Sequence, residues 1–234
     1  MKKIKIYADG ADINEMVKMD NENFVTGFTT NPTLMSRLGI TDYLGFAKEV
    51  LSKIKNKSIS FEVFSDDIDD MYRQALILRD LGDNVWVKIP VTNTQSEYTY
   101  DLINKLSNEG VKINATALFT KDHIQNVYDA LNKNVNSIIS IFAGRIANAG
   151  IDPEPTMKFA SDLTINYDNI ETLWASSREV FNVMQAERTN TDIITLPFSL
   201  IKAYKKEVGK NLDEFSLETV KMFYNDAKDS GFSL

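Results

Sequence analysis

The feature that most constrains the fold is an alternation of short apolar runs with amphipathic segments, repeated eight times at a period of roughly 28 residues. The predicted strands lie at 4–8, 25–29, 59–64, 85–90, 111–115, 137–143, 172–175 and 192–196. The predicted helices lie at 11–18, 41–54, 65–81, 94–108, 121–131, 155–163, 178–186, 198–208 and 212–228. Strands that alternate with helices form parallel sheets, because a helical crossover returns the chain to the same edge.

Eight such units, without a linker rich in Pro, Gly or Ser, predict a single (β/α)8 TIM barrel over residues 1–234, slightly under the usual ~250 residues. A doubly wound open sheet is the alternative. It would be expected to carry a glycine-rich nucleotide loop, and the sequence contains neither GxGxxG nor a P-loop. An extra C-terminal helix follows the eighth unit. Met222, Phe223 and Phe232 give the segment 212–234 apolar groups, which we expect to contact another subunit.

Composition narrows the classes of function. A net charge of −7 disfavours binding to nucleic acid or to an anionic membrane through the general field of the protein. The chain has no cysteine, which excludes disulfides and thiolate chemistry, and we expect its one histidine, His123, to be a surface residue. The N-terminus lacks the apolar core of a signal peptide, and no run is long enough to span a membrane, so we expect a cytoplasmic protein.

One lysine stands inside an apolar strand. Lys88 lies in VWVKIP at 85–90, and Pro90 ends the strand because it has no N–H to donate. Burial disfavours the ammonium form, and a neutral amine is a nucleophile toward carbonyl groups. The other interpretation is a barrel-interior lysine that pairs with a carboxylate or reaches toward the strand end, and this strand alone does not decide between them.

Polar residues recur where the predicted strands end, which is the edge at which active sites of (β/α)8 barrels form. They are Asp9, Thr30, Asn31, Glu62, Lys88, Asn114, Thr116, Ser140, Arg145, Ser176 and Arg178. Each has a structural explanation by itself, such as a helix cap for Asn31 or a surface ion pair for an arginine. Because seven consecutive strands supply such a group, the set as a whole predicts a functional site.

The set divides into three kinds of chemistry. The candidate nucleophile and the candidate acid and base are Lys88, Asp9 and Glu62. The neutral groups that suit sugar hydroxyls are Asn31, Asn114, Thr116 and Ser140. The groups that suit an anionic end, because a guanidinium matches the geometry of phosphate, are Arg145, Ser176 and Arg178.

Five segments resemble motifs of the transaldolase family. They are GFTTNPTL at 27–34, VWVKIP at 85–90, NATALFT at 114–120, SIFAGR at 140–145 and ASSR at 175–178. Their order and spacing match the family to about Pro197, and the chain length resembles the short branch, which also contains fructose-6-phosphate aldolase. The resemblance implies a class I aldolase on a (β/α)8 barrel, with a Schiff-base lysine on the fourth strand, where Lys88 lies.

The resemblance also implies a role for each matching residue. Lys88 forms the imine, Asp9 removes the C4 hydroxyl proton, and Glu62 with Thr116 moves protons through a water. The residues that bind the substrate around its three-carbon unit are Thr30, Asn31, Asn114, Ser140 and Phe142. The residues that hold phosphate are Arg145, Ser176 and Arg178. Neither a metal nor an organic cofactor is implied, and the relatives imply a homo-oligomer such as a pentamer-based decamer.

Two residues favour transaldolase over aldolase, since the aldolase subgroup usually has Gln and Tyr in place of Glu62 and Phe142. Phenylalanine has no hydroxyl with which to quench an enamine, so we expect transfer to dominate over cleavage. The expected reaction transfers dihydroxyacetone between sugar phosphates in the non-oxidative pentose phosphate pathway. The alternatives are fructose-6-phosphate aldolase, a sulfo-sugar transaldolase, because Ser177 replaces a usual aromatic beside the anion site, and a non-catalytic sugar-phosphate-binding barrel.

Overall fold

A computed structural model describes residues 3–233. Predictions that fall on residues 1, 2 and 234, at the two ends of the chain, lie outside the described residues. The described chain divides into two compact units, with the boundary between Ile201 and Lys202. The first unit contains a closed parallel barrel in which each strand pairs with the next and the last pairs with the first. The predicted (β/α)8 fold is therefore confirmed.

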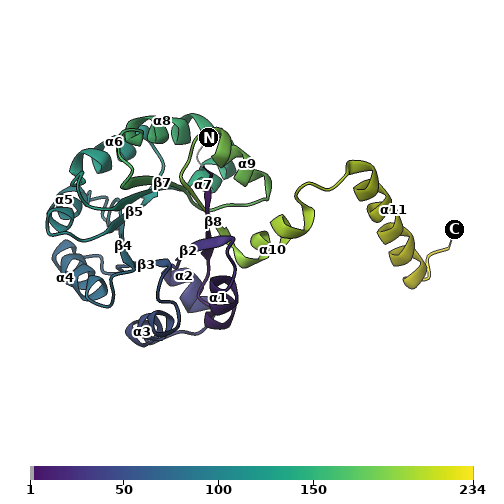
Figure 1. The fold of residues 1–234 in the computed structure, drawn as a ribbon, viewed down its shortest axis with the longest axis horizontal. Coiled ribbons are helices and arrows are strands. Elements are labelled where there is room, and N and C mark those ends of the chain that lie inside the picture. The colour runs from purple at the N-terminus through teal and green to yellow at the C-terminus, as the bar shows by residue number, and fades with distance from the viewer. Residues whose placement is uncertain (1–2, 234) are drawn as a thin grey trace. The chain divides into compact units, whose positions relative to one another are not determined.

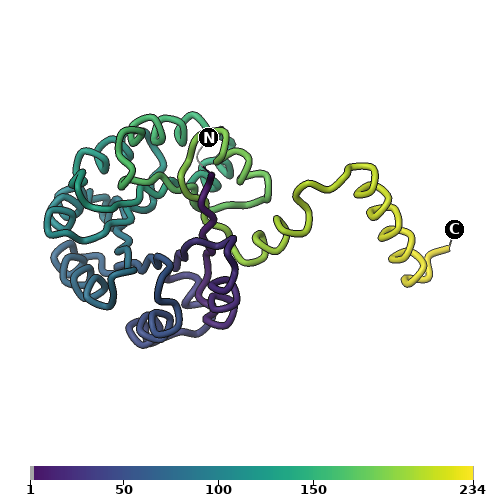
Figure 2. Tube along the Cα trace, in the orientation of Figure 1, coloured from purple at the N-terminus to yellow at the C-terminus, as the bar shows by residue number. Residues whose placement is uncertain are grey.

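Figure 1 shows the strands as a ring with helices around it, and Figure 2 shows the first and last strands side by side where the ring closes. The strands are β1 (Lys5–Asp9), β2 (Val25–Thr29), β3 (Ser58–Glu62), β4 (Val85–Pro90), β5 (Ile113–Leu118), β6 (Ser137–Ile141), β7 (Ile170–Trp174) and β8 (Ile193–Pro197). The helices are α1 (Ile13–Asp20), α2 (Pro32–Arg37), α3 (Tyr43–Lys53), α4 (Ile68–Arg79), α5 (Tyr100–Asn108), α6 (Lys121–Ala130), α7 (Ala143–Asn148), α8 (Glu154–Thr164), α9 (Phe181–Arg188), α10 (Phe198–Glu207) and α11 (Leu212–Asp229).

The barrel strands are buried on both faces, as their near-continuous apolar sequences require. Phe28, Phe61 and Trp174 are fully buried, and Ile89 and Ile113 are buried with them. Against this apolar background, some of the buried polar groups, including Thr30 and Lys88, stand near the carboxyl ends of strands, and the buried Asn114 is in register with Lys88. The polar end of the barrel is thus where the sequence predicted a site.

Side-chain caps fix where several helices begin. The carboxylate or hydroxyl of Asp12, Asp42, Asp67 and Thr120 accepts a hydrogen bond from the backbone N–H three residues later. Asn31 does the same for Leu34, and Pro32 follows it at the first helical position of α2. Asp12, Asn31, Asp67 and Thr120 follow within a few residues of a strand, so these caps fix where the chain turns from strand to helix at the barrel mouth.

The predicted helix at 94–108 is wrong in its first third, since α5 begins only at Tyr100. Asn93 Oδ1 accepts hydrogen bonds from the backbone N–H groups of Gln95 and Glu97. Ser96 has a φ of 67°, and Thr99 Oγ1 donates to the carbonyl of Pro90 at 2.6 Å. These local bonds satisfy the backbone in a loop, and they outweigh the helical preference of the segment.

Other boundaries also differ from prediction, and two of them lie close to the site. The expected strand at 137–143 ends at Ile141, and Ala143 instead opens the short helix α7, which the sequence analysis did not predict. The helix expected at 178–186 begins at Phe181. Asn182 Oδ1 accepts from the N–H groups of Arg178 and Glu179, which keeps these two residues in the loop before α9.

The second unit contains α11, which confirms the predicted C-terminal helix. Asn211 caps it by accepting hydrogen bonds from the N–H groups of Asp213 and Glu214. None of its described residues is buried, and Val220 and Phe223 are 59% and 62% exposed. The extent of a single domain over 1–234 and the contact of this segment with another subunit remain predictions.

No helix in the described part of the chain combines the length and the apolar character needed to cross a bilayer.

Candidate functional site

A cavity of about 440 Å³ opens among the carboxyl ends of the barrel strands. Ten residues predicted for the site line it, namely Asp9, Asn31, Glu62, Lys88, Thr116, Ser140, Phe142, Arg145, Ser176 and Arg178. The other two predicted residues, Thr30 and Asn114, are fully buried and do not line it. The structure therefore brings the predicted residues together, with two of them behind the cavity wall.

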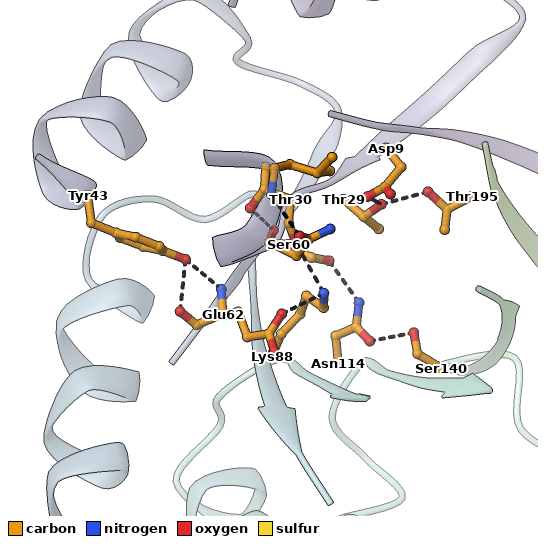
Figure 3. Close-up of polar contacts among 12 residues, drawn as sticks. Asp9, Thr29, Thr30, Tyr43, Ser60, Glu62, Lys88, Asn114, Ser140 and Thr195 are labelled. Atoms are coloured by element: carbon orange, nitrogen blue, oxygen red, sulfur yellow. Dashed lines mark hydrogen bonds and ion pairs between the residues drawn. The ribbon is translucent and has the colours of Figure 1, made fainter. Parts of the chain in front are cut away.

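Lys88 is the most enclosed charged group of the cavity, at 6% exposure. Its Nζ lies 2.8 Å from Glu62 Oε2 and donates to the carbonyl of Thr30 at 3.0 Å (Figure 3). Glu62 and Lys88 are partners in the register of β3 and β4, so adjacent strands present both side chains at one level. The carboxylate pairing that the sequence left as an alternative is present, and it supplies a proton acceptor directly beside the amine.

Asp9 is the second carboxylate, and it accepts a hydrogen bond from the hydroxyl of Thr29. Thr29 Oγ1 donates to Asp9 Oδ1 at 2.7 Å and lies 2.6 Å from Thr195 Oγ1. A hydroxyl has one proton, so Thr29 accepts from Thr195 when it donates to Asp9. Burial raises the pKa of Asp9, while the bond from Thr29 and the charge of Lys88 oppose that rise.

Asn114 belongs to a buried chain of hydrogen bonds below the cavity. Its Nδ2 donates to Ser60 Oγ at 3.0 Å, and Ser140 Oγ donates to its Oδ1 at 2.7 Å (Figure 3). Thr30 is held similarly, because its hydroxyl donates to the carbonyl of Ser60 at 2.9 Å. Thr30 thus reaches Lys88 through its carbonyl, whereas Asn114 reaches the cavity through Ser140.

Thr116 has a polar atom without a partner. Its Oγ1 is buried and forms no hydrogen bond with the described residues, although it lines the cavity. The pairing of β5 with β6 shifts register between Ala115 and Leu118, and Ala117 has a φ of 61°. Such a bulge re-aims a side chain next to a site. A buried hydroxyl left unpaired is costly, so this oxygen fits a bound water or ligand atom.

Three guanidinium groups line the cavity, from Arg37, Arg145 and Arg178. None of the three forms an ion pair in the described part of the chain, although Arg145 lies over the ring of Phe142 at 5.8 Å. With Lys88 they outnumber the lining carboxylates Asp9 and Glu62. A cationic cavity in an acidic protein is suited to an anionic ligand, as predicted for Arg145 and Arg178.

Comparisons with known proteins identify the family of this chain. The family model described as Transaldolase/Fructose-6-phosphate aldolase matches residues 6–234. The chain belongs to this family. A probable transaldolase of Thermoplasma volcanium is 35% identical over 202 residues, covering 85% of this chain and 86% of the relative. A probable transaldolase of Bartonella tribocorum is 31% identical over 230 residues, covering 97% and 98%.

The sequence analysis of this transaldolase-family chain missed several residues of the site. Thr29 and Thr195 contact Asp9 or each other, and Arg37 lines the cavity. Thr29 directly precedes a predicted site residue and is in register with Asp9, so strand pairing would have found it. Arg37 lies on the last turn of α2, and no feature of its local sequence indicates the cavity.

The anion-binding side depends on a close backbone approach at Gly144. A Cβ there would lie 1.7 Å from the carbonyl oxygen of Ser176, whose own φ is 65°. Gly144→Ala must therefore move the loop that carries Ser176 and Arg178. We expect binding of inorganic phosphate, measured by calorimetric titration, to weaken about tenfold or more. Gly82→Ala is the control, since its Cβ meets nothing closer than 3.2 Å; equal affinities in both variants would contradict the prediction.

Proposed function

We propose that this protein is a transaldolase that carries a dihydroxyacetone unit on Lys88. The donor is fructose 6-phosphate, or sedoheptulose 7-phosphate in reverse, and the acceptor is erythrose 4-phosphate or glyceraldehyde 3-phosphate. These reactions belong to the non-oxidative pentose phosphate pathway. The observation that carries the proposal is a buried lysine, 2.8 Å from a carboxylate, in a cavity that is also lined by guanidinium groups. A binding protein for sugar phosphates has no need of such an amine.

Imine formation follows from the contact of Lys88 with Glu62. The ammonium transfers a proton to Glu62, and the neutral amine attacks the C2 carbonyl of the ketose to form a carbinolamine. Glu62 then returns the proton to the hydroxyl, which leaves as water, so the product is a protonated imine. The unpartnered Thr116 Oγ1 suits the water that relays these protons.

Cleavage follows from the position of Asp9 across the cavity. Asp9 takes the proton of the C4 hydroxyl, the C3–C4 bond breaks, and its electron pair moves to the protonated imine to form a neutral enamine. The aldose phosphate leaves. A second aldose phosphate then accepts the enamine carbon, Asp9 returns the proton to the new alkoxide, and hydrolysis of the imine releases the product.

The remaining residues bind and orient the substrate in this proposal. Asn31 has its Oδ1 occupied by the helix cap, which leaves its amide nitrogen for a sugar hydroxyl. Asn114 acts through Ser140, which it holds, and Thr30 acts through its carbonyl on Lys88. The phosphate is held by Arg145, Ser176 and Arg178. Ser177 is engaged elsewhere, since its hydroxyl donates to the carbonyl of Thr195 at 2.8 Å.

The setting of the protein is also part of this proposal. The proposed substrates are sugar phosphates of central metabolism, and we propose that the enzyme acts in the cytoplasm. The apolar residues exposed on α11, including Val220 and Phe223, suit a homo-oligomer, and a pentamer-based decamer is the form we propose. Size-exclusion chromatography with light scattering measures this state directly.

Borohydride trapping tests the covalent step. With fructose 6-phosphate present, we expect a dihydroxyacetone-sized adduct on the peptide that contains Lys88, because reduction fixes the imine. Erythrose 4-phosphate added before borohydride should discharge the adduct. Lys88→Met should give no adduct, whereas Lys112→Met, which removes a lysine bonded to the Asp83 carbonyl outside the cavity, should behave as the wild type. An unmodified wild-type protein would mean that the covalent mechanism is wrong.

A substitution at Phe142 tests whether transfer dominates over cleavage. Phe142 lines the cavity, and its ring lies 5.8 Å from that of Phe119. Phe142→Tyr adds a hydroxyl that can protonate the enamine, so we expect faster release of dihydroxyacetone without an acceptor. Phe119→Tyr, which adds a hydroxyl outside the cavity lining, is the matched control. A ratio of transfer to cleavage that Phe142→Tyr leaves unchanged would remove this basis for choosing transaldolase over fructose-6-phosphate aldolase.

The raised pKa of Asp9 predicts the acid side of the pH profile. Asp9 must be ionised to act as a base, so activity falls as pH decreases through its pKa. Thr29→Val removes a hydrogen bond that favours the carboxylate, and the acid limb of kcat should therefore move to higher pH. Thr26→Val, on the same strand but bonded to the Ile6 carbonyl, should not move it. A limb that stays in place or moves to lower pH in Thr29→Val would show that Asp9 is not the base.

A further inference from the structure

Glu62 has backbone groups that its barrel cannot pair. In a parallel strand, alternate residues direct their N–H and C=O toward opposite neighbours. On the β4 side, Val63 N–H donates to the Lys88 carbonyl, and on the β2 side the Ser60 carbonyl accepts from Thr30 N–H. The backbone N–H and C=O of Glu62 point to the same side of the strand as those of Ser60, and so toward β2. That strand has already ended, because its last pair with β3 is Thr29 with Ser60.

A single tyrosine hydroxyl takes the place of the missing strand. Tyr43 Oη donates to the carbonyl of Glu62 at 2.8 Å and accepts from its N–H, also at 2.8 Å. Figure 3 shows the ring reaching from α3 to this backbone, with Lys88 on the opposite side of Glu62. The hydroxyl thereby fixes both the N–H and the C=O of Glu62.

The position of Tyr43 is itself fixed. It is the first residue of α3, directly after the cap Asp42, whose Oδ1 accepts from the N–H of Gly45 at 2.8 Å. Its ring lies 5.1 Å from that of Phe64. Burial raises the pKa of Tyr43, so its hydroxyl keeps the proton that it donates to Glu62. The cap, the ring contact and the protonated hydroxyl together make a rigid support.

We infer that Tyr43 is a positioning residue, which holds Glu62 where its carboxylate exchanges protons with Lys88. This inference rests on the proposed function, because it assigns Tyr43 to the proton transfers of imine formation. Tyr43 does not line the cavity, so it acts through Glu62 and touches no substrate. A freed Glu62 backbone lets the carboxylate leave its 2.8 Å contact with Lys88 Nζ, which slows proton transfer without weakening phosphate binding.

The test compares Tyr43→Phe with a tyrosine variant of similar chemistry elsewhere in the barrel. Tyr7 is buried and accepts a hydrogen bond from Ser58 Oγ at 2.7 Å, outside the cavity lining, which makes Tyr7→Phe the control. Single-turnover trapping with fructose 6-phosphate and borohydride measures the rate of imine formation, steady-state kinetics separate kcat from KM, and thermal unfolding reports stability. Tyr43→4-aminophenylalanine restores a donor and an acceptor at the same place.

We expect Tyr43→Phe to slow imine formation about ten- to a hundredfold, with KM changed by less than about twofold. Tyr43→4-aminophenylalanine should recover most of the rate, and Tyr7→Phe should keep the wild-type rate even where it unfolds at a lower temperature. The inference is overturned, and the proposed function kept, if Tyr43→Phe forms the imine at the wild-type rate, or if Tyr7→Phe slows it equally. A wild type that forms no adduct overturns both. Should Tyr43→Phe not fold, the aminophenylalanine variant is compared with Tyr7→Phe instead. Because an aniline forms weaker hydrogen bonds than a phenol, a residual loss in the rate of imine formation at an unchanged KM supports the inference, and a rate equal to that of Tyr7→Phe overturns it.

Discussion

The rest of this structure depends on the ion pair between Lys88 and Glu62 inside the barrel mouth. Two charges removed from water stabilise each other only while both stay in place, and loss of one partner of a buried pair costs about 3–5 kcal/mol. The register of β3 and β4 sets the two residues at one level. The Thr30 carbonyl, directly after β2, adds a second acceptor for the ammonium.

The cavity has the opposite sign of charge from the protein that contains it. The chain carries a net charge of −7. The charged groups that line the cavity are the cations Lys88, Arg37, Arg145 and Arg178 and the carboxylates Asp9 and Glu62. A cationic cleft in a low-dielectric wall raises the local concentration of anionic ligands, while the acidic exterior repels them. The cleft therefore concentrates ligands with an anionic end without making the whole surface attractive to polyanions.

Much of the fold and of the site was predictable because both follow from local patterns. Apolar runs gave the strands, and the ends of those strands placed residues such as Lys88 and Asp9 in one cavity. The loop at 94–99 was not predictable, because its conformation depends on Asn93 accepting two backbone bonds and Thr99 reaching back to Pro90. These bonds join particular side chains to particular backbone groups, and averaged residue preferences do not contain them.

The role of Tyr43 at the site was also not predictable from the sequence. Its spacing with other apolar residues predicts a core-facing position on a helix, which describes its ring but not its hydroxyl. The need for that hydroxyl arises only because β2 ends two residues before β3, and relative strand lengths follow from barrel closure. Thr116 is similar, since the bulge at Ala117 determines where its side chain points. Local sequence patterns do not identify residues whose role is to complete the hydrogen bonds of another residue.

The two carboxylates have different environments, and in the proposed reaction this difference couples their protonation. Glu62 contacts the ammonium directly, whereas Asp9 accepts a hydrogen bond from the hydroxyl of Thr29. The charge of Lys88 lowers the pKa of Asp9. When the C3–C4 bond breaks, the protonated imine becomes a neutral enamine and that positive charge disappears. The pKa of Asp9 then rises at the moment it must keep the proton taken from the C4 hydroxyl. When the acceptor bonds to the enamine, the charge returns, the pKa falls, and Asp9 releases the proton to the new alkoxide. In the proposed reaction, the protonated imine on Lys88 thus serves as the electron sink, and its charge also determines when Asp9 holds a proton.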